Sequence, residues 1–322
     1  MNSPSPESGI ADLYAAARRE IAKVIVGADD LVEHVLIALF AGGHVLIEGV
    51  PGTAKTLLVR VVAQLFDCCF RRVQFTPDLM PADITGTNVF DPRDQSFRFR
   101  QGPVFAQLLL GDEINRAPPK TQAALLEAMQ ERQVTVDGVS HRLPTLFTVF
   151  ATQNPVEQEG TYPLPEAQLD RFMMKVHADY PEEAGEVEVL RVHQRGLRVD
   201  DLKRFDLQRI GGEAELLAAQ DEIHNRTIRD ELLGYIARVV RGTRDNLKVE
   251  VGASPRAGLM VLTAAKARAA LRGRPHVLPD DIKAVVKPVL RHRLVLKPNA
   301  EVDGFSADDV LDEVLGRTEI PR

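Results

Sequence analysis

The chain has 322 residues, 44% of them hydrophobic, which is enough to bury the core of one large domain or of two unequal ones. Its formal net charge of −6 gives no overall attraction to nucleic-acid phosphates or anionic lipid, although a local basic channel is compatible with it. Residues 1–9 lack the apolar core of a secretory signal, and no later segment is apolar and long enough to span a bilayer. We therefore expect a soluble cytoplasmic protein with a disordered tail over residues 1–9, and we do not expect nucleic acid as its partner.

The pattern of apolar residues divides the chain into two parts. In the first part, short β-rich runs alternate with helical stretches, which predicts an open parallel sheet covered by helices. In the second part, apolar residues such as Leu232 and Ile236 recur at the spacing of amphipathic helices. The acidic run 181–186 follows the last strand-like segment and marks the boundary. We predict an α/β domain over residues 1–180, followed by a linker and a small all-α lid domain over residues 181–322.

Residues 44–56 contain the strongest motif. An apolar run reads as a buried strand that leads into a glycine loop and then a helix, which is the context of a Walker A loop. Gly49 and Gly52 let backbone N–H groups curl around an anionic phosphate, and the helix N-terminus adds partial positive charge. Lys55 then reaches the β- and γ-phosphates, and Thr56 offers its hydroxyl to Mg²⁺. The alternative is a glycine-rich turn before an ordinary helix, which the strand, lysine and threonine together disfavour.

The loop departs from the strict motif at one position, where glycine normally precedes the lysine. Ala54 stands there in this chain, and we expect its backbone to be helical already, a conformation that alanine accepts. We predict that the loop binds ATP together with Mg²⁺. The residues expected to contact the nucleotide are Gly49, Val50, Pro51, Gly52, Thr53, Ala54, Lys55, Thr56 and Leu57.

A second motif follows the strand-like run 105–110. The run ends at Gly111, and two carboxylates come next, Asp112 and Glu113, in the pattern of a Walker B strand. At the end of a strand, Asp112 can hold the magnesium shell, and Glu113 can polarise a water for in-line attack on the γ-phosphate. Taken alone, two acids in this position are as readily helix-capping residues. Beside a Walker A loop, the catalytic interpretation is favoured.

Asn154 follows the apolar segment 146–152 and precedes Pro155, so it is expected at the tip of another strand. Ligands of open parallel sheets collect at the carboxyl ends of the strands, which would place Asn154 beside the two motifs above. We predict that it orients the attacking water. The alternative is that Asn-Pro serves only as a turn.

Two arginines could bring positive charge to the developing γ-phosphate oxygens. Arg171 lies just before the next strand-like run, where an ordinary surface ion pair is the competing interpretation. Ser254 and Pro255 predict a helix start, which places Arg256 in a first turn where the helix dipole disfavours a cation. A nearby phosphate would explain this placement, and a solvated arginine is the alternative.

These motifs, in this order, resemble those of the MoxR-type AAA+ ATPases, and the resemblance runs from residue 24 to residue 294. The segments that carry it are 48–56, 112–117, 151–155, 165–172 and 252–257. The resemblance implies an AAA+ P-loop core with a helical lid, in which alanine before the lysine is normal.

The resemblance also implies roles for single residues. Asn154 would be sensor 1, Arg256 would be sensor 2, and Arg171 would be the arginine finger that acts on the ATP of a neighbouring subunit. Arg116 could be a second charge of that kind, and the sequence does not rank it against Arg171. The resemblance further implies a homo-oligomeric ring, usually a hexamer, in which Val24, Ile25 and Val26 form an apolar wall for the adenine.

Two hairpins are expected within the first part. One spans residues 87–100 with its turn at 91–94, and the other spans residues 134–143 with an Asp-Gly turn at 137–138. In the related AAA+ branch one β-hairpin interrupts the second helix and another precedes sensor 1, so the resemblance implies that both hairpins could reach a client in the central pore. The alternative is a pair of surface hairpins without a partner.

The resemblance implies an ATP-dependent remodelling chaperone whose client is a protein. It also implies that this chaperone could act together with a von Willebrand factor type A domain protein. The sequence itself contains no client-binding motif. Two other functions stay open: a nucleotide-gated switch with little turnover, and a DNA-directed AAA+ protein. Glu113 and Asn154 argue against the switch, and the acidic charge balance argues against DNA.

Overall fold

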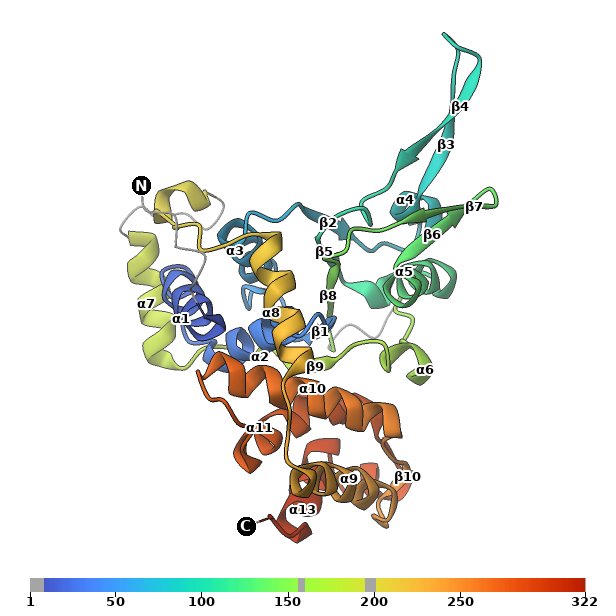
Figure 1. Ribbon diagram of the computed structural model, residues 1–322. Coiled ribbons are helices and arrows are strands. Elements are labelled where there is room, and N and C mark those ends of the chain that lie inside the picture. Colours follow the sequence, from blue (N-terminus) through green and yellow to red (C-terminus); the bar gives the residue numbers. More distant parts are fainter. Residues whose placement is uncertain (1–8, 156–159, 195–200, 322) are drawn as a thin grey trace.

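The computed structural model describes residues 9–155, 160–194 and 201–321, so most of the tail expected at residues 1–9 lies outside the described residues. A five-stranded parallel sheet forms the centre of the first part (Figure 1). In spatial order its strands are β2 (Phe70–Gln74), β5 (Leu108–Asp112), β8 (Thr148–Gln153), β1 (Val45–Glu48) and β9 (Met174–His177). Strand β5 therefore begins and ends later than the predicted run 105–110.

The three central strands, β1, β5 and β8, are buried at almost every position because both faces of the sheet are covered there, whereas the edge strands β2 and β9 also carry polar residues. Val45 and Ile47 belong to the core that includes α1 (Ile10–Ile21), α2 (Asp29–Phe40) and α3 (Lys55–Leu65). Leu46, between them, belongs to a second core with α5 (Pro119–Glu131) on the opposite face. The alternation along β1 thus fixes which helices cover which face.

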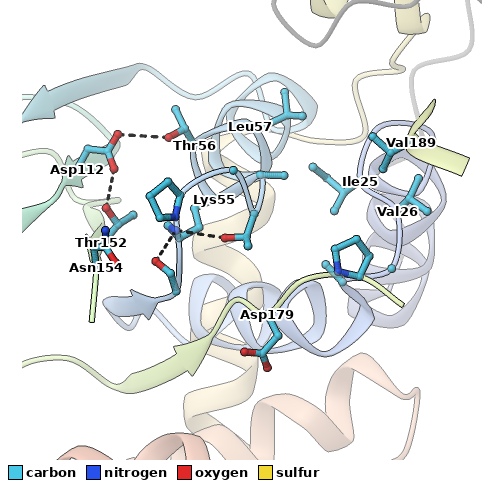
Figure 2. A pocket seen from close by; sticks show the side chains of 18 of the residues that line it. Ile25, Val26, Lys55, Thr56, Leu57, Asp112, Thr152, Asn154, Asp179 and Val189 are labelled. Atoms are coloured by element: carbon cyan, nitrogen blue, oxygen red, sulfur yellow. Dashed lines mark hydrogen bonds between the residues drawn. The ribbon is translucent and has the colours of Figure 1, made fainter. Parts of the chain in front are cut away.

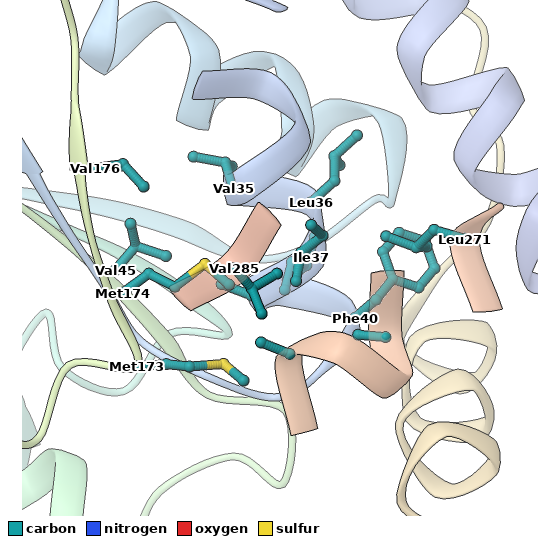
Figure 3. Packing of buried hydrophobic residues seen from close by; sticks show 14 of the residues in the cluster. Val35, Leu36, Ile37, Phe40, Val45, Met173, Met174, Val176, Leu271 and Val285 are labelled. Carbon is teal, nitrogen blue, oxygen red and sulfur yellow. The ribbon is translucent and has the colours of Figure 1, made fainter. Parts of the chain in front are cut away.

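The second part is mainly helical, and its helices pack on the α2 side of the sheet (Figure 1). Buried residues of α2 share one core with Val45 and Met174 of the sheet, Leu271 of α10 (Pro255–Leu271) and Val285 of α11 (Pro279–Leu290) (Figure 3), and α11 also contacts β9 directly. The elements of this part are α7 (Glu183–Gln194), η2 (Leu202–Phe205), α8 (Glu213–Asn225), α9 (Asp230–Arg244), β10 (Val249–Val251), α10 (Pro255–Leu271), α11 (Pro279–Leu290), η3 (Arg291–Arg293), β11 (Val295–Leu296), α12 (Pro298–Val302) and α13 (Ala307–Arg317).

The lid carries one feature that the all-α expectation did not include, a short antiparallel pair formed by β10 and β11. Helix α8 packs against α2 of the first part as well as against α10 of the second. The division of the chain between residues 180 and 181 stays a prediction.

Both hairpins are formed in the predicted places. Strands β3 (Gly86–Asp91) and β4 (Ser96–Gln101) follow the short helix α4 (Pro81–Thr85) and project away from the body of the molecule (Figure 1). Strands β6 (Gln133–Val136) and β7 (Val139–Arg142) turn at residues 137–138, where both residues have positive φ.

The two hairpins touch each other. Asn88 Nδ2 donates to Asp137 Oδ2 at 2.6 Å, and the rings of Phe99 and His141 stack with their centroids 3.8 Å apart. The hairpins therefore form one connected unit.

A buried ionic cluster joins α10 and α11 to α2. Asp281, with a fully buried side chain, accepts from Arg268 Nη1 at 2.9 Å and from the side chain of Arg274. Its second oxygen accepts from the backbone N–H of Leu278 and so caps α11. Arg268 also donates to Glu33 of α2 at 2.9 Å. Removing one partner of a buried ion pair leaves an uncompensated charge.

We expect the Asp281→Ala substitution to lower the free energy of unfolding by about 3–5 kcal/mol, since it removes the buried carboxylate that Arg268 and Arg274 share as well as the cap of α11. The matched control is Asp280→Ala, whose carboxylate is 83% exposed and should contribute no more than about 1 kcal/mol. Urea unfolding of the two variants checks this. Equal losses would contradict a special role for the buried cluster.

Candidate nucleotide-binding site

A cavity of about 550 Å³ lies at the carboxyl ends of strands β1, β5 and β8. Its wall is formed by segments from several parts of the chain (Figure 2). These are residues 24–28, Gly49, residues 51–57, Asp112, Glu113, residues 152–154, Asp179, Pro181 and Val189. The parallel sheet thus brings the separate sequence motifs to one place.

The loop after β1 is closely packed around the Lys55 side chain. Lys55 Nζ donates to the carbonyls of Gly49 at 2.8 Å and Val50 at 2.6 Å. Thr53 Oγ1 donates to the same Val50 carbonyl at 3.0 Å. Burial lowers the pKa of the Lys55 ammonium from its ordinary value, and the nearby carboxylates of Asp112 and Glu113 oppose that shift.

Gly49 is required for steric reasons. A Cβ atom at this position would lie 2.3 Å from the backbone carbonyl oxygen of Ala178, the residue that follows the adjacent strand β9. The chain after β1 and the chain after β9 can therefore approach only because residue 49 has no side chain.

The expectation for Ala54 was wrong. Its backbone is left-handed, with φ of 58°, and the residue is the N-cap of α3 instead of part of the helix. The reason is that the loop must reverse direction before α3 begins at Lys55. Alanine in this conformation costs roughly 1–2 kcal/mol more than in the right-handed region.

Asp112 is held by three neighbouring elements. Its Oδ1 accepts from the hydroxyl of Thr152 at 2.6 Å, and its Oδ2 accepts from Arg72 Nη2 at 2.6 Å. Thr56 of α3 donates to Oδ2 at a longer distance of 3.4 Å (Figure 2). The Thr152 hydroxyl also accepts from the backbone N–H of Glu113 at 2.9 Å, so it ties the two acidic residues together.

Glu113 follows β5 in a left-handed conformation, with φ of 57°. Its Oε2 accepts from Gln74 Nε2 at 2.7 Å and from Arg116 Nη1 at 3.0 Å. A non-glycine residue in this region is strained, and the two side-chain contacts help to hold it there.

Three of these residues were not predicted: Arg72, Gln74 and Thr152. Gln74 pairs in register with Asp112, and Arg72 lies two residues earlier on the same edge strand. Polar residues at alternate positions of a strand beside a Walker B strand are the signal that could have identified them. Thr152 lies two residues before Asn154, at the end of the apolar segment 146–152.

The structure places the remaining predicted residues in two groups. Asn154 is buried and lines the cavity. Val24 lines it as well, and so do Ile25, Val26, Leu57 and Val189 of α7 (Figure 2). Val50, Arg171 and Arg256 do not line the cavity. Arg171 Nε donates to Gln130 Oε1 at 3.0 Å, and Arg256 Nε lies 3.7 Å from Asp170 Oδ2.

The chain matches two family models. One describes the ATPase family associated with various cellular activities (AAA) and covers residues 44–174, and the other describes the AAA lid domain and covers residues 241–314. Chaperone MoxR1 of Mycobacterium tuberculosis is 44% identical over 312 residues, which is 94% of this chain and 81% of the relative. The protein MoxR of Methylorubrum extorquens is 36% identical and covers 90% of each chain.

The chain belongs to the MoxR family of AAA+ ATPases. A crystal structure of a presumed ATPase from Cytophaga hutchinsonii superposes with a TM-score of 0.88 at 40% identity, over 97% of this chain and 96% of that one. The MoxR resemblance and the fold of a P-loop core with a helical lid are thus confirmed. Over the part of this MoxR chain that the structure describes, the helices are too short or too polar to cross a bilayer.

Two threonines on β8 of this MoxR protein allow a test of how much the hydrogen bonds of Thr152 to Asp112 and Glu113 stabilise the fold. Thr152→Val should lower the free energy of unfolding by about 1–3 kcal/mol, because the Glu113 N–H loses its acceptor and Asp112 loses a donor. Thr148 is the matched control, since its buried hydroxyl has no hydrogen-bond partner among the described residues. Thr148→Val should be neutral or stabilising. Urea unfolding that ranks the two variants the other way would contradict this account.

Proposed function

We propose that this chain is an ATP-dependent chaperone or remodelling ATPase of the MoxR type, which binds ATP with Mg²⁺ and hydrolyses it. The observation that supports this most is the convergence of Lys55, Thr56, Asp112 and Glu113 on one cavity. A phosphate-binding loop alone would serve any nucleotide-binding protein. A second carboxylate beside the first is what activation of an attacking water requires.

The donor set at the loop fits a hard divalent cation. Thr56 Oγ1 and Asp112 Oδ2 lie 3.4 Å apart, and Mg²⁺ prefers oxygen ligands of this kind. Thr56 and Asp112 would hold the ion, which when bound supplies positive charge to the phosphate oxygens. Lys55 adds a cation at the centre of the loop, where the backbone of residues 51–54 curls around the phosphates.

Glu113 and Asn154 act on the attacking water in this proposal. Both line the cavity, and they come from the ends of adjacent strands. The contacts from Gln74 and Arg116 both go to Oε2 of Glu113, so the water is taken at Oε1. Asn154 orients the same water.

The ATP lies at the interface between two copies in a homo-oligomeric ring, proposed to be a hexamer. Arg171 completes the site of the neighbouring copy, and Arg116 is a second candidate for that role. Arg171 does not line the cavity of its own chain, which is consistent with action on another copy. Arg256 is sensor 2, and it reaches the phosphate when a rigid-body movement brings the first turn of α10 towards the cavity.

The client is proposed to be a protein. The projecting β3–β4 hairpin carries an exposed aromatic pair, Phe90 and Phe97, whose ring centroids lie 5.4 Å apart, and Phe97 is 70% exposed. Exposed apolar side chains on a projecting element favour a protein contact. The name of the relative Chaperone MoxR1 supports a chaperone role, and a von Willebrand factor type A domain protein is the partner that the resemblance suggests.

The decisive test is phosphate release by the purified protein. Glu113→Gln should lower the turnover number by about 10²–10⁴-fold, since the base is lost, while binding of a fluorescent ATP analogue persists. Glu127→Gln, on the exposed face of α5, is the control and should match the wild type. Equal phosphate release by the Glu113→Gln variant and the wild type would contradict hydrolysis at this site and favour the nucleotide-gated switch.

A further inference from the structure

The segment that carries Arg171 is bound by a buried arginine of the lid. The guanidinium of Arg293, in the turn η3, donates from Nε to Asp170 Oδ1 at 2.7 Å. Its Nη2 donates to the carbonyl of Phe172 at 2.6 Å and to that of Asp170 at 3.2 Å. Its Nη1 donates to the carbonyl of Met173 at 3.4 Å. One side chain therefore binds the backbone on both sides of Arg171.

This contact is buried. The Arg293 side chain is only 3% exposed, and burial lowers the pKa of its guanidinium while the Asp170 carboxylate opposes that shift. The neighbouring His292 is also buried, and its Nε2 lies 3.1 Å from the same Phe172 carbonyl. Hydrogen bonds to a charged group are shorter and stronger than neutral ones, particularly where water is excluded.

Asp170 faces two lid arginines at once. Its Oδ1 is bound by Arg293, and its Oδ2 lies 3.7 Å from Arg256 Nε at the start of α10. The Asp170 carboxylate, next to Arg171 in the chain, thus interacts with two separate lid elements, η3 and α10. The Arg171 side chain itself extends to Gln130 of α5.

We propose that Arg293 is a positioning residue for hydrolysis: through Asp170 and the adjacent carbonyls it fixes Arg171 to the lid of its own copy. The orientation of that lid then sets where the Arg171 charge is delivered in the neighbouring copy. This inference rests on the proposed role of Arg171 in a neighbouring ATP site.

The test uses Asp170→Ala in the full-length chain. The turnover number should fall by about tenfold to a hundredfold, because an error of about 1 Å in the position of a charged group costs on this scale. The KM for ATP and the binding of a fluorescent ATP analogue should stay within about twofold, since Asp170 does not line the variant's own cavity. Asp170→Asn, which keeps a hydrogen-bond acceptor for Arg293, should recover part of the activity and serves as the readout if the alanine variant does not fold.

The matched control is Asp308→Asn. Asp308 forms a bidentate pair with Arg291, at 3.0 and 2.9 Å, beside the same lid turn but without contact to the Arg171 segment among the described residues. Its turnover number should match the wild type. An equal loss in Asp308→Asn and Asp170→Asn would overturn the proposal in favour of general lid damage.

Subunit mixing separates this inference from the proposed function. Asp170→Ala subunits keep Glu113, and Glu113→Gln subunits keep a correctly held Arg171, so mixed assemblies should release more phosphate than either variant alone. Arg171→Ala mixed with Glu113→Gln shows whether Arg171 acts between copies. If this second mixture stays inactive, Arg171 does not act on a neighbour, and the positioning role of Arg293 is overturned with it. Hydrolysis at the cavity is tested separately by Glu113→Gln, so that proposal stands or falls on its own result. If it recovers activity while the Asp170→Ala mixture does not, only the positioning role of Arg293 is overturned.

Discussion

The carboxylate of Asp112 is hydrogen-bonded by Arg72, Thr152 and Thr56, which come from β2, β8 and α3. Strand β5 lies between β2 and β8 in the sheet, so its last residue is the point that both neighbours can reach. Helix α3, which follows the Walker A loop, contacts the same carboxylate through Thr56. The parallel register of these strands therefore determines whether the loop, the two carboxylates and Asn154 lie at the same cavity.

The site combines this support with local backbone strain. Ala54 and Glu113 both have left-handed backbones, one just before the phosphate-binding helix and one at the second carboxylate. Such conformations persist only where surrounding contacts overdetermine them. The hydrogen bonds of Gln74, Arg116 and Thr152 meet that condition at Glu113. The contacts from the neighbouring strand β2, the residues after β5 and strand β8 thus stabilise the unfavourable backbone conformation of Glu113.

Much of the site could be predicted because its motifs are local. The strand, loop and helix of residues 45–56 follow each other directly, and the hairpin at residues 134–143 contains its own turn signal. Contacts of Arg72 and Thr152 with Asp112 could not be predicted in this way, since they depend on strand order. The conformation of Ala54 was mispredicted because the reversal before α3 is set by how the loop closes. The contacts of Asp170 with Arg293 and Arg256 join distant segments, and no local pattern marks them.

The connection between β7 and β8 has a mechanical consequence. Strand β7 ends at Arg142, and only residues 143–147 separate it from β8, which carries Thr152. The two hairpins contact each other through Asn88 with Asp137 and Phe99 with His141, so a displacement of the longer hairpin would also act on the shorter one and on this short connection. If a client binds the longer hairpin, as proposed, that displacement would extend to the strand whose Thr152 hydroxyl binds Asp112.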